Sequence, residues 1–435
     1  MGKGMIIYQV LTRLWGEGRF SSWDQASFDY LRSLGIDYIW YTGIPRHASG
    51  KDFVKGDPGS PYAISDWYDV NPYLADRKGS RMKEFEALVG RTHKAGFRCL
   101  IDFIPNHVAC DYSGALAVHD WCDGDWTDTR KVDWSAPSTK EEFIRVLKFW
   151  ASKGVDGFRC DMVELVPSDA LGEVIAEVRK DYPGLLFVAE VYGRENYARY
   201  LDEAGFDLLY DKSGSYDILR GILDGSHSAR ELTWNWQSLG QRQGSMLNFL
   251  ENHDEQRLAS DAFAGSPGRA WAALAYSMLF NDASFMLYAG QELGENASES
   301  GDGRTSIFYW CEPASLRHIW TLIHDGKGAG MQERSILAAY RRLCSLKQRI
   351  AGSMNWDLCY CNEDAPGFNP DTMTAFVRFE RRRALLVFCN FSNSDAASLL
   401  TIPFELRDAA GITAETVQVS AAPWGFTLMK LNVTK

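Results

Sequence analysis

The sequence predicts an α/β fold, a (β/α)8 TIM barrel followed by a smaller antiparallel β-sandwich domain. Apolar strand-like runs alternate with amphipathic helix-like stretches over most of the chain, which is typical of parallel β/α units. Near Met354 the pattern changes to short runs of β-branched and aromatic residues. A chain of 435 residues, 46% of them hydrophobic, can bury two cores. We place the barrel at residues 1–353 and the sandwich at 354–435, with a short insertion at 108–138 after the third strand.

The barrel elements follow in chain order from the hydrophobic periodicity. The apolar runs predicted as strands are residues 5–10, 36–41, 97–103, 155–161, 185–190, 206–210, 246–254 and 284–289. The stretches predicted as helices are residues 22–34, 83–95 and 139–153, and a further one that starts at Ser168. Ser22 and Ser168 each precede acidic residues and helical periodicity, so we expect both to cap helix N-termini.

The C-terminal region has a different pattern of short strands. Its apolar runs are residues 374–379, 384–388, 398–402 and 427–431. Asn, Asp, Gly and Pro separate these runs, as they do between the strands of antiparallel sheets. The pattern indicates a β-sandwich.

The charge balance argues against several classes of partner. The chain has 46 Lys+Arg against 57 Asp+Glu, a net charge of −11 that repels phosphate backbones and anionic membranes. Its nine cysteines have no metal-like spacing, which is typical of reduced thiols. The N-terminus lacks the apolar core of a secretion signal, and no apolar run approaches membrane-spanning length. We therefore expect a cytoplasmic protein that binds neither nucleic acid nor membrane.

Three carboxylates, Asp161, Glu190 and Asp254, each close the apolar run of a different predicted strand. The C-terminal strand ends of a parallel barrel meet at one face, and that face carries the active site. The three acids should therefore lie together there. Glycoside hydrolysis uses paired carboxyl groups of this kind, so the pattern points to sugar chemistry.

Four short motifs occur in order at predicted strand ends. They are Asp102-Phe-Ile-Pro-Asn-His107, Gly157-Phe-Arg-Cys-Asp161, Val188-Ala-Glu190 and Asn252-His-Asp254. An acid in one such motif is commonly a cap or turn residue, but four motifs in order are specific. Together they resemble the signatures of the α-amylase family of retaining α-glucan enzymes, glycoside hydrolase family 13.

The resemblance implies a role for each acid. Asp161 matches the family nucleophile, which forms a covalent β-glycosyl intermediate, and Glu190 matches the acid that then acts as base. A retaining enzyme needs the two carboxyl groups about 5 Å apart. Arg159 lies two residues before Asp161, so both side chains point the same way, and its charge favours ionised Asp161. Asp254 matches the third acid, which favours the distorted, oxocarbenium-like sugar.

Three more residues match sugar-binding positions of the family. His107 and His253 match histidines that donate hydrogen bonds to the sugar unit held by Asp254, and Tyr62 matches a tyrosine that stacks on its ring. The Tyr62 segment departs from the family pattern, because Pro61 and Ala63 stand where Gly and Asp are usual. The alternative for His107 and His253 is a hydrogen-bonded histidine in the core, and the alternative for Tyr62 is a packing aromatic.

The insertion between His107 and the helix at residues 139–153 lies where the family often carries a calcium site. Asn106 matches a residue that ligates calcium in metal-binding relatives. Carboxylates in the insertion that have suitable oxygens are Asp111, Asp120, Asp123, Asp125, Asp128 and Asp133. The insertion is short, however, and its spacing fits no EF-hand loop, so we expect no metal and no other cofactor. Tryptophans that either floor sugar subsites or pack this loop are Trp121, Trp126 and Trp134.

The leading hypothesis is a retaining hydrolase of α-glucosidic bonds in malto-oligosaccharides or related α-glucans. One alternative is a transglycosylase or isomerase of the same family, which uses the same acids and a sugar acceptor. Another is a catalytically silent glycan-binding homologue, which the retention of all three acids and Arg159 disfavours. The bond type is open between α-1,4 and α-1,6. A polar loop at residues 295–309 follows the last strand and should help to select the glucan.

Overall fold

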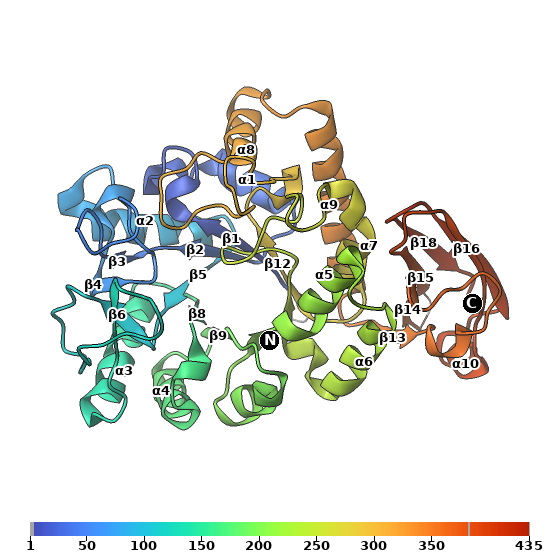
Figure 1. Ribbon diagram of the computed structural model, residues 1–435, viewed down its shortest axis with the longest axis horizontal. Coiled ribbons are helices and arrows are strands. Elements are labelled where there is room, and N and C mark those ends of the chain that lie inside the picture. The colour runs from blue at the N-terminus through green and yellow to red at the C-terminus, as the bar shows by residue number, and fades with distance from the viewer. Residues whose placement is uncertain (1–3, 382, 435) are drawn as a thin grey trace.

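The computed structural model describes residues 4–381 and 383–434. Eight parallel strands close into a barrel in the order β1-β12-β11-β10-β9-β8-β5-β2, which confirms the predicted TIM barrel (Figure 1). The barrel strands are β1 (Ile6–Leu11), β2 (Tyr38–Thr42), β5 (Arg98–Phe103), β8 (Gly157–Cys160), β9 (Leu186–Ala189), β10 (Leu208–Tyr210), β11 (Met246–Asn248) and β12 (Ser284–Tyr288).

Helices surround the barrel and cover the outer face of its strands (Figure 1). They are α1 (Gln25–Ser33), α2 (Arg81–Lys94), α3 (Pro137–Ser152), α4 (Ser168–Asp181), α5 (Asp217–Asp224), α6 (Arg230–Leu239), α7 (Trp271–Leu279), α8 (Ala314–Asp325) and α9 (Met331–Ile350). The region between residues 211 and 283 forms three of these helices, none of which the sequence patterns had indicated.

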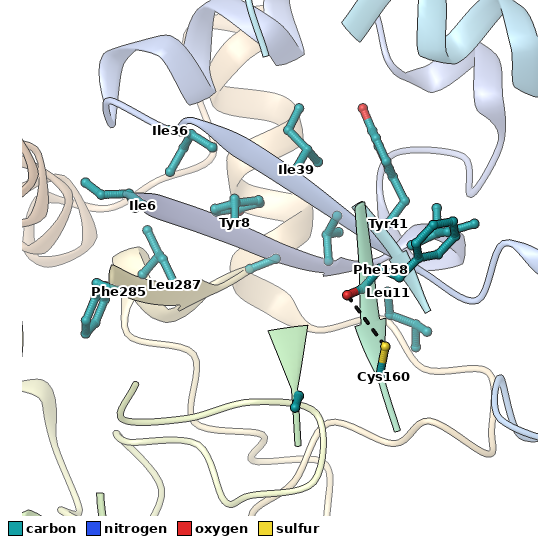
Figure 2. Packing of buried hydrophobic residues seen from close by; sticks show 14 of the residues in the cluster. Ile6, Tyr8, Leu11, Ile36, Ile39, Tyr41, Phe158, Cys160, Phe285 and Leu287 are labelled. Carbon is teal, nitrogen blue, oxygen red and sulfur yellow. Dashed lines mark hydrogen bonds between the residues drawn. The ribbon is translucent and has the colours of Figure 1, made fainter. Parts of the chain in front are cut away.

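The strands are apolar on both faces because each face meets a different core. On β1, Ile6 and Tyr8 belong to the large cluster between strands and helices, while Ile7 belongs to the cluster inside the barrel. Figure 2 shows Ile6 and Tyr8 near Leu287 of β12 within the outer cluster. Alternation with period two explains this division, and it also decides which polar side chains reach the mouth of the barrel.

Two helix starts differ from the sequence prediction. The N-cap of α1 is Asp24, whose Oδ1 accepts a hydrogen bond from the Ser27 backbone at 2.9 Å, and Ser22 lies in a preceding 3-10 turn. A carboxylate at this position satisfies an exposed backbone N–H as well as a hydroxyl does. Ser168 is the first residue of α4 rather than its cap, because Pro167 takes the cap position without a side-chain hydrogen bond.

Two small hairpins stand above the C-terminal ends of the barrel strands. Strands β3 (Pro45–His47) and β4 (Ile64–Val70) pair after β2, and β6 (His107–Ala109) pairs with β7 (Thr129–Lys131) after β5. Except for His107, the strands of the second hairpin lie within residues 108–138, the insertion predicted after the third barrel strand. Both hairpins bring residues from outside the barrel to the face where the acids were expected.

The C-terminal strands form two antiparallel sheets around a second core, as predicted for a β-sandwich. Figure 1 shows them in red beside α7. The elements are β13 (Met354–Asp357), β14 (Met373–Glu380), β15 (Arg383–Asn390), β16 (Ala396–Thr401), α10 (Phe404–Ala410), β17 (Thr416–Ala421) and β18 (Phe426–Leu431). The sequence patterns had indicated neither β13 nor β17 nor α10.

Side chains from both parts join the sandwich to the barrel. Arg378 of β14 reaches the loop after α7, where its Nη2 lies 2.6 Å from Asp282 Oδ1. Asp357 of β13 accepts hydrogen bonds from Thr233 and Trp236 of α6, at 2.8 and 2.9 Å. All nine cysteines are free thiols. Within residues 4–381 and 383–434, no helix is long and apolar enough to cross a membrane.

Candidate active site

A cavity of about 270 Å³ opens at the C-terminal ends of the barrel strands. Its lining residues come from barrel strand ends, from both hairpin regions and from the loop after β12, and they are Lys55, Ser60, Tyr62, His107, Trp126, Asp128, Thr129, Asp161, Met162, Glu190, Tyr192, Asp254, Ile307 and Phe308. The three predicted acids are therefore in one cavity. Asp161 and Glu190 directly follow β8 and β9, but Asp254 lies on a loop, because β11 ends already at Asn248.

Arg159 lies at the centre of the acids and is fully buried. Its Nη1 donates a hydrogen bond to Asp161 Oδ1. Its Nη2 lies 2.9 Å from Glu190 Oε1 and 4.0 Å from Asp254 Oδ2. Because both terminal nitrogens are bonded to one carbon, the contacts place Asp161 and Glu190 within several ångströms of each other. The predicted alternation along β8 accounts for this placement.

Three aromatic side chains hold the guanidinium in place. The rings of Trp40, Tyr62 and Tyr210 have their centroids 5.4, 5.5 and 5.5 Å from the Arg159 guanidinium carbon. Arg159 Nε also donates a hydrogen bond to the Tyr210 hydroxyl at 3.2 Å. Cation–π contacts of this kind strengthen when water is excluded, so the arginine keeps a fixed orientation toward the acids.

Glu190 is buried and its pKa is raised. Its Oε2 accepts a hydrogen bond from the Met162 backbone and its Oε1 accepts one from the Tyr192 hydroxyl, both at 2.8 Å. Burial raises the pKa of Glu190 to about 7, and the negative charges of Asp161 and Asp254 add to the effect against the opposing charge of Arg159. Near neutral pH this carboxyl group therefore holds its proton for a large part of the time.

Asp161 and Asp254 differ in their surroundings. Burial raises the pKa of Asp161, although the charge of Arg159 and its hydrogen bond oppose this and favour the carboxylate. Burial also acts on Asp254, but there the charge and hydrogen bond of His253 prevail and lower its pKa. The side chain of Asp254 is 39% exposed and faces the open part of the cavity. Its backbone oxygen accepts a hydrogen bond from Arg304 Nε at 2.7 Å, which fixes the loop.

His253 and Tyr62 form one stacked pair. Their ring centroids are 5.0 Å apart, and the Tyr62 hydroxyl lies 2.5 Å from His253 Nε2. Nε2 is also 3.0 Å from Asp254 Oδ2, and Nδ1 is 2.6 Å from the side-chain nitrogen of Gln9. When Gln9 donates to Nδ1, Nε2 carries the proton and donates to Asp254. Tyr62 lines the cavity, although Pro61 and Ala63 beside it depart from the family pattern.

His107 also lines the cavity, from the start of β6. Its ring packs on Trp126 of the insertion at a centroid distance of 5.2 Å. Burial lowers the pKa of His107 to about 4, so the ring is neutral at physiological pH. The other tryptophans of the insertion take different positions: Trp121 is half exposed, and Trp134 stacks on Phe143.

Two loops meet at the mouth of the cavity. One follows β3 and the other is the predicted polar loop after β12. Trp310 Nε1 donates a hydrogen bond to Asp57 at 3.0 Å, and the Lys55 ammonium lies 5.7 Å from the Phe308 ring. Gly56 has φ +69°, and an added Cβ would lie 1.8 Å from the Phe308 carbonyl oxygen. Only glycine permits so close an approach of the two backbones.

Several cavity residues were not found from the sequence. Tyr192 follows Glu190 by two residues, so continuing the alternation beyond β9 would have indicated it. Lys55 and Phe308 carry no such signal, because loop conformation alone brings them to the acids, whereas Met162 directly follows Asp161 in the sequence. Met162 is the strained residue of the group, with φ +47°, a value that residues other than glycine rarely adopt.

A second buried arginine–glutamate pair lies below the Asp254 loop. Arg257 Nη1 donates a hydrogen bond to Glu251 Oε1 and its Nε donates one to Thr305, both at 2.8 Å. Burial raises the pKa of Glu251 to about 7, as it does for Glu190. The space beside Glu251 is only about 10 Å³, which is about one water molecule. This pair therefore has no room for a substrate.

Comparison with known proteins supports the family assignment. The model of the α-amylase catalytic domain matches residues 25–127 and 123–358. The α-amylase MalA of Haloarcula japonica is 26% identical over 455 aligned positions, which cover 96% of this chain and 61% of MalA. An α-1,4-glucan:maltose-1-phosphate maltosyltransferase of Cereibacter sphaeroides is 28% identical over 42% of this chain and 34% of its own length. The chain thus spans less than two thirds of either relative.

The fold is shared with solved structures. The crystal structure of an α-amylase from Lactobacillus plantarum superposes with a TM-score of 0.73 at 23% identity, over 98% of each chain. The family model covers most of the barrel and all four motifs that surround Arg159. The chain belongs to the α-amylase family.

Proposed function

We propose that this chain is a retaining glycoside hydrolase that cleaves α-glucosidic bonds in malto-oligosaccharides or related α-glucans by double displacement. The observation that carries the proposal is that Asp161 and Glu190 both contact the buried guanidinium of Arg159 and both line the same open cavity. A retaining mechanism needs a carboxylate on one side of the scissile bond and a protonated carboxyl group on the other.

The surroundings of the two acids support different roles. Arg159 donates its aligned hydrogen bond to Asp161, which favours the carboxylate and suits a nucleophile. Glu190 has a pKa raised to about 7, which suits a group that first donates a proton and then removes one from water. Attack by Asp161 on the anomeric carbon breaks the glycosidic bond, and Glu190 protonates the departing oxygen. Water activated by Glu190 then releases the sugar.

The remaining residues suit a sugar ring held beside Asp161. Asp254 presents a carboxylate to hydroxyl groups, and Tyr62 lines the cavity beside it. His253 lies behind them, and its Nε2 is 3.0 Å from Asp254 Oδ2. Contacts that improve as the ring flattens toward an oxocarbenium ion accelerate the reaction. The net charge of −11 suits a neutral substrate.

A product time course tests the proposal. Purified protein is incubated with maltotriose and with pullulan, and the products are separated while the anomer released first is followed by NMR. We expect shorter sugars that initially have the α-configuration. Longer sugars would instead favour a transglycosylase, and isomerised products an isomerase. No products at all would favour a silent glycan-binding homologue, and a β-anomer would contradict double displacement.

A further inference from the structure

Three oxygen atoms from three separate segments converge on the ammonium group of Lys131, the last residue of β7. Nζ donates hydrogen bonds to Asn106 Oδ1, to Asp123 Oδ2 at 2.8 Å and to the Leu165 carbonyl oxygen at 3.2 Å. Its side chain is only 14% exposed. An ammonium group has three protons, and here each one has its own acceptor.

The three acceptors are of the kind that binds a hard metal ion. They are a side-chain amide oxygen, a carboxylate and a backbone carbonyl, which are typical calcium ligands. Asn106 is fully buried, and its amide nitrogen also donates a hydrogen bond to Asp123 at 2.8 Å. This bond fixes the Asn106 and Asp123 side chains relative to each other. The ammonium group occupies the point on which they converge. A divalent ion does not fit there, because it would meet both the bulk and the positive charge of Lys131.

The remaining described residues offer no alternative metal centre of the usual kind. Across residues 4–381 and 383–434, no group of three or more His, Cys, Asp or Glu side chains is arranged to hold a metal ion. One carboxylate, Asp123, faces one ammonium at Lys131, so the charges at this point already balance. The calcium that the family resemblance raises as an option thus has its position taken by a side chain of this protein.

Lys131 also connects the insertion to the reacting groups. It pairs with His107, which lines the cavity, across the β6–β7 hairpin. Leu165 ends the short turn that follows Asp161 and begins with the strained Met162. The Met162 backbone N–H is the group that donates to Glu190. A strained turn persists only where its surroundings fix it, and the bond to Leu165 fixes one end.

We propose that the Lys131 ammonium is a built-in cation that replaces a divalent metal ion, locks the insertion to the turn after β8, and so positions Met162 and Glu190. Lys131 is thus a positioning residue that contacts no substrate. Its effect on rate rests on the function proposed above. Its effect on thermal stability and on calcium binding does not, so the two proposals can fail separately.

The first test uses thermal unfolding of the whole chain, with no reference to activity. The proteins are the wild type, Lys131→Met, Lys131→Ala and a control, Lys140→Met, which removes an exposed lysine paired with Glu173. Each is unfolded in a chelator and in millimolar calcium chloride. We expect calcium to leave the wild type and Lys140→Met unchanged. Both Lys131 variants should lose several degrees of Tm in chelator, because three acceptors lose their donor.

Lys131→Ala should regain Tm in calcium, because the shortened side chain leaves the three oxygens facing an open space. Lys131→Met should not, because its thioether fills that space without binding a hard ion. Adding Asp123→Asn to Lys131→Ala should abolish the response. Two results would overturn the proposal: wild-type protein that loses stability in chelator and recovers it with calcium, or Lys131→Ala that shows no calcium response.

The second test separates binding from catalysis. With maltotriose, Lys131→Met should lower kcat by roughly tenfold, because small displacements of the reacting groups are costly, while KM changes little. Calcium should restore kcat in Lys131→Ala and leave Lys131→Met low. A kcat for Lys131→Met equal to that of Lys140→Met would overturn the positioning role. If no variant and no wild-type protein turns over sugar, the function proposal fails while the unfolding results still decide the role of Lys131.

Discussion

Two buried arginines in this molecule each hold a glutamate whose pKa is raised to about 7, yet only one of these pairs is a candidate for chemistry. Glu190 lines a cavity of about 270 Å³, and Arg159 is buried behind it. Glu251 lines a space of only about 10 Å³, and its partner Arg257 is buried beside it. Burial is the first cause of the raised pKa in both cases, so a perturbed pKa alone does not identify a site. An open cavity and a second acid beside the glutamate are needed to identify one.

The two pairs also differ in how completely their hydrogen bonds are used. Glu251 accepts from Arg257 Nη1 and from the Leu258 backbone, and Arg257 also holds Thr305. That pair ties the Asp254 loop to the polar loop after β12. At the site, Arg159 Nη2 lies 2.9 Å from Glu190 without making an aligned hydrogen bond. The enclosed pair is built for stability, whereas in the open pair the Glu190 carboxyl group lines a cavity that can hold a substrate.

The largest difference between the pairs should appear on replacing the proposed nucleophile. Asp161→Asn keeps the side-chain volume and removes the attacking carboxylate, so kcat on maltotriose should fall by at least about 10⁴-fold with an unchanged circular dichroism spectrum. Glu251→Gln, which makes the same kind of change at the enclosed pair, should keep kcat within about threefold of the wild type. Steady-state kinetics on both variants checks this. Equal losses would mean that the open pair is not special.

Glu190→Gln should show an effect that depends on the leaving group. With maltotriose the first step should slow by about 10³-fold, because no proton reaches the departing oxygen. An aryl glycoside with an acidic phenol needs no such proton, so its first step should be largely spared. Pre-steady-state release of the phenol measures that step. If activated and natural substrates were slowed equally, Glu190 would not be the acid.

Arg257→Met should reverse the pattern and affect stability rather than rate. Removing the arginine leaves Glu251 buried without its partner, which should lower the free energy of unfolding by about 3 kcal/mol. The folded fraction should keep the wild-type kcat, since Arg257 lines no part of the cavity. Denaturant titration and active-site-normalised kinetics measure the two effects. Loss of kcat with full stability would show that the enclosed pair takes part in the chemistry.

The order of the barrel strands and the position of two acids could be predicted from the sequence, because Asp161 and Glu190 directly follow apolar runs. The direction of the Arg159 side chain, toward the same side as Asp161, could be predicted from the alternation of side chains along β8. Asp254 was wrongly placed on a strand, since a loop with apolar Phe249 and Leu250 continues the run beyond β11. Lys131 and Phe308 had no signal, because their positions depend on tertiary packing of loops. The predicted caps Ser22 and Ser168 were wrong because Asp24 and Pro167 take the N-cap positions.

The pH dependence of stability should not distinguish the two glutamates. In both, the folded-state pKa of about 7 lies above the ordinary value of 4.5, so the folded protein keeps protons that the unfolded chain releases. Their favourable contribution is complete below about pH 4.5 and is lost as the pH rises through 7. Glu251→Gln should therefore flatten the decline in unfolding free energy over this range, by an amount on the order of 3 kcal/mol. Urea titrations across the range measure it.

Of the two glutamates, only Glu190 should affect the pH dependence of activity. Turnover should decline above about pH 7 as Glu190 loses its proton, and Glu251→Gln should leave this limb in place. Tyr192→Phe should move the limb upward by up to about one pH unit, because the lost hydrogen bond favoured the charged carboxylate. This is the smallest expected effect, and a pH profile of kcat/KM measures it. A limb unchanged by Tyr192→Phe would place the controlling proton elsewhere.

Mass spectrometry of a trapped intermediate tests the central claim most directly. Glu190→Gln protein is mixed with an α-glucosyl fluoride whose additional ring fluorine slows the second step, then digested and sequenced by fragmentation. The account predicts one glycosyl group on the carboxylate of Asp161, and none in the Asp161→Asn, Glu190→Gln double variant. A glycosyl group on any other residue, or turnover of the fluoride with no covalent adduct and inverted configuration, would contradict it.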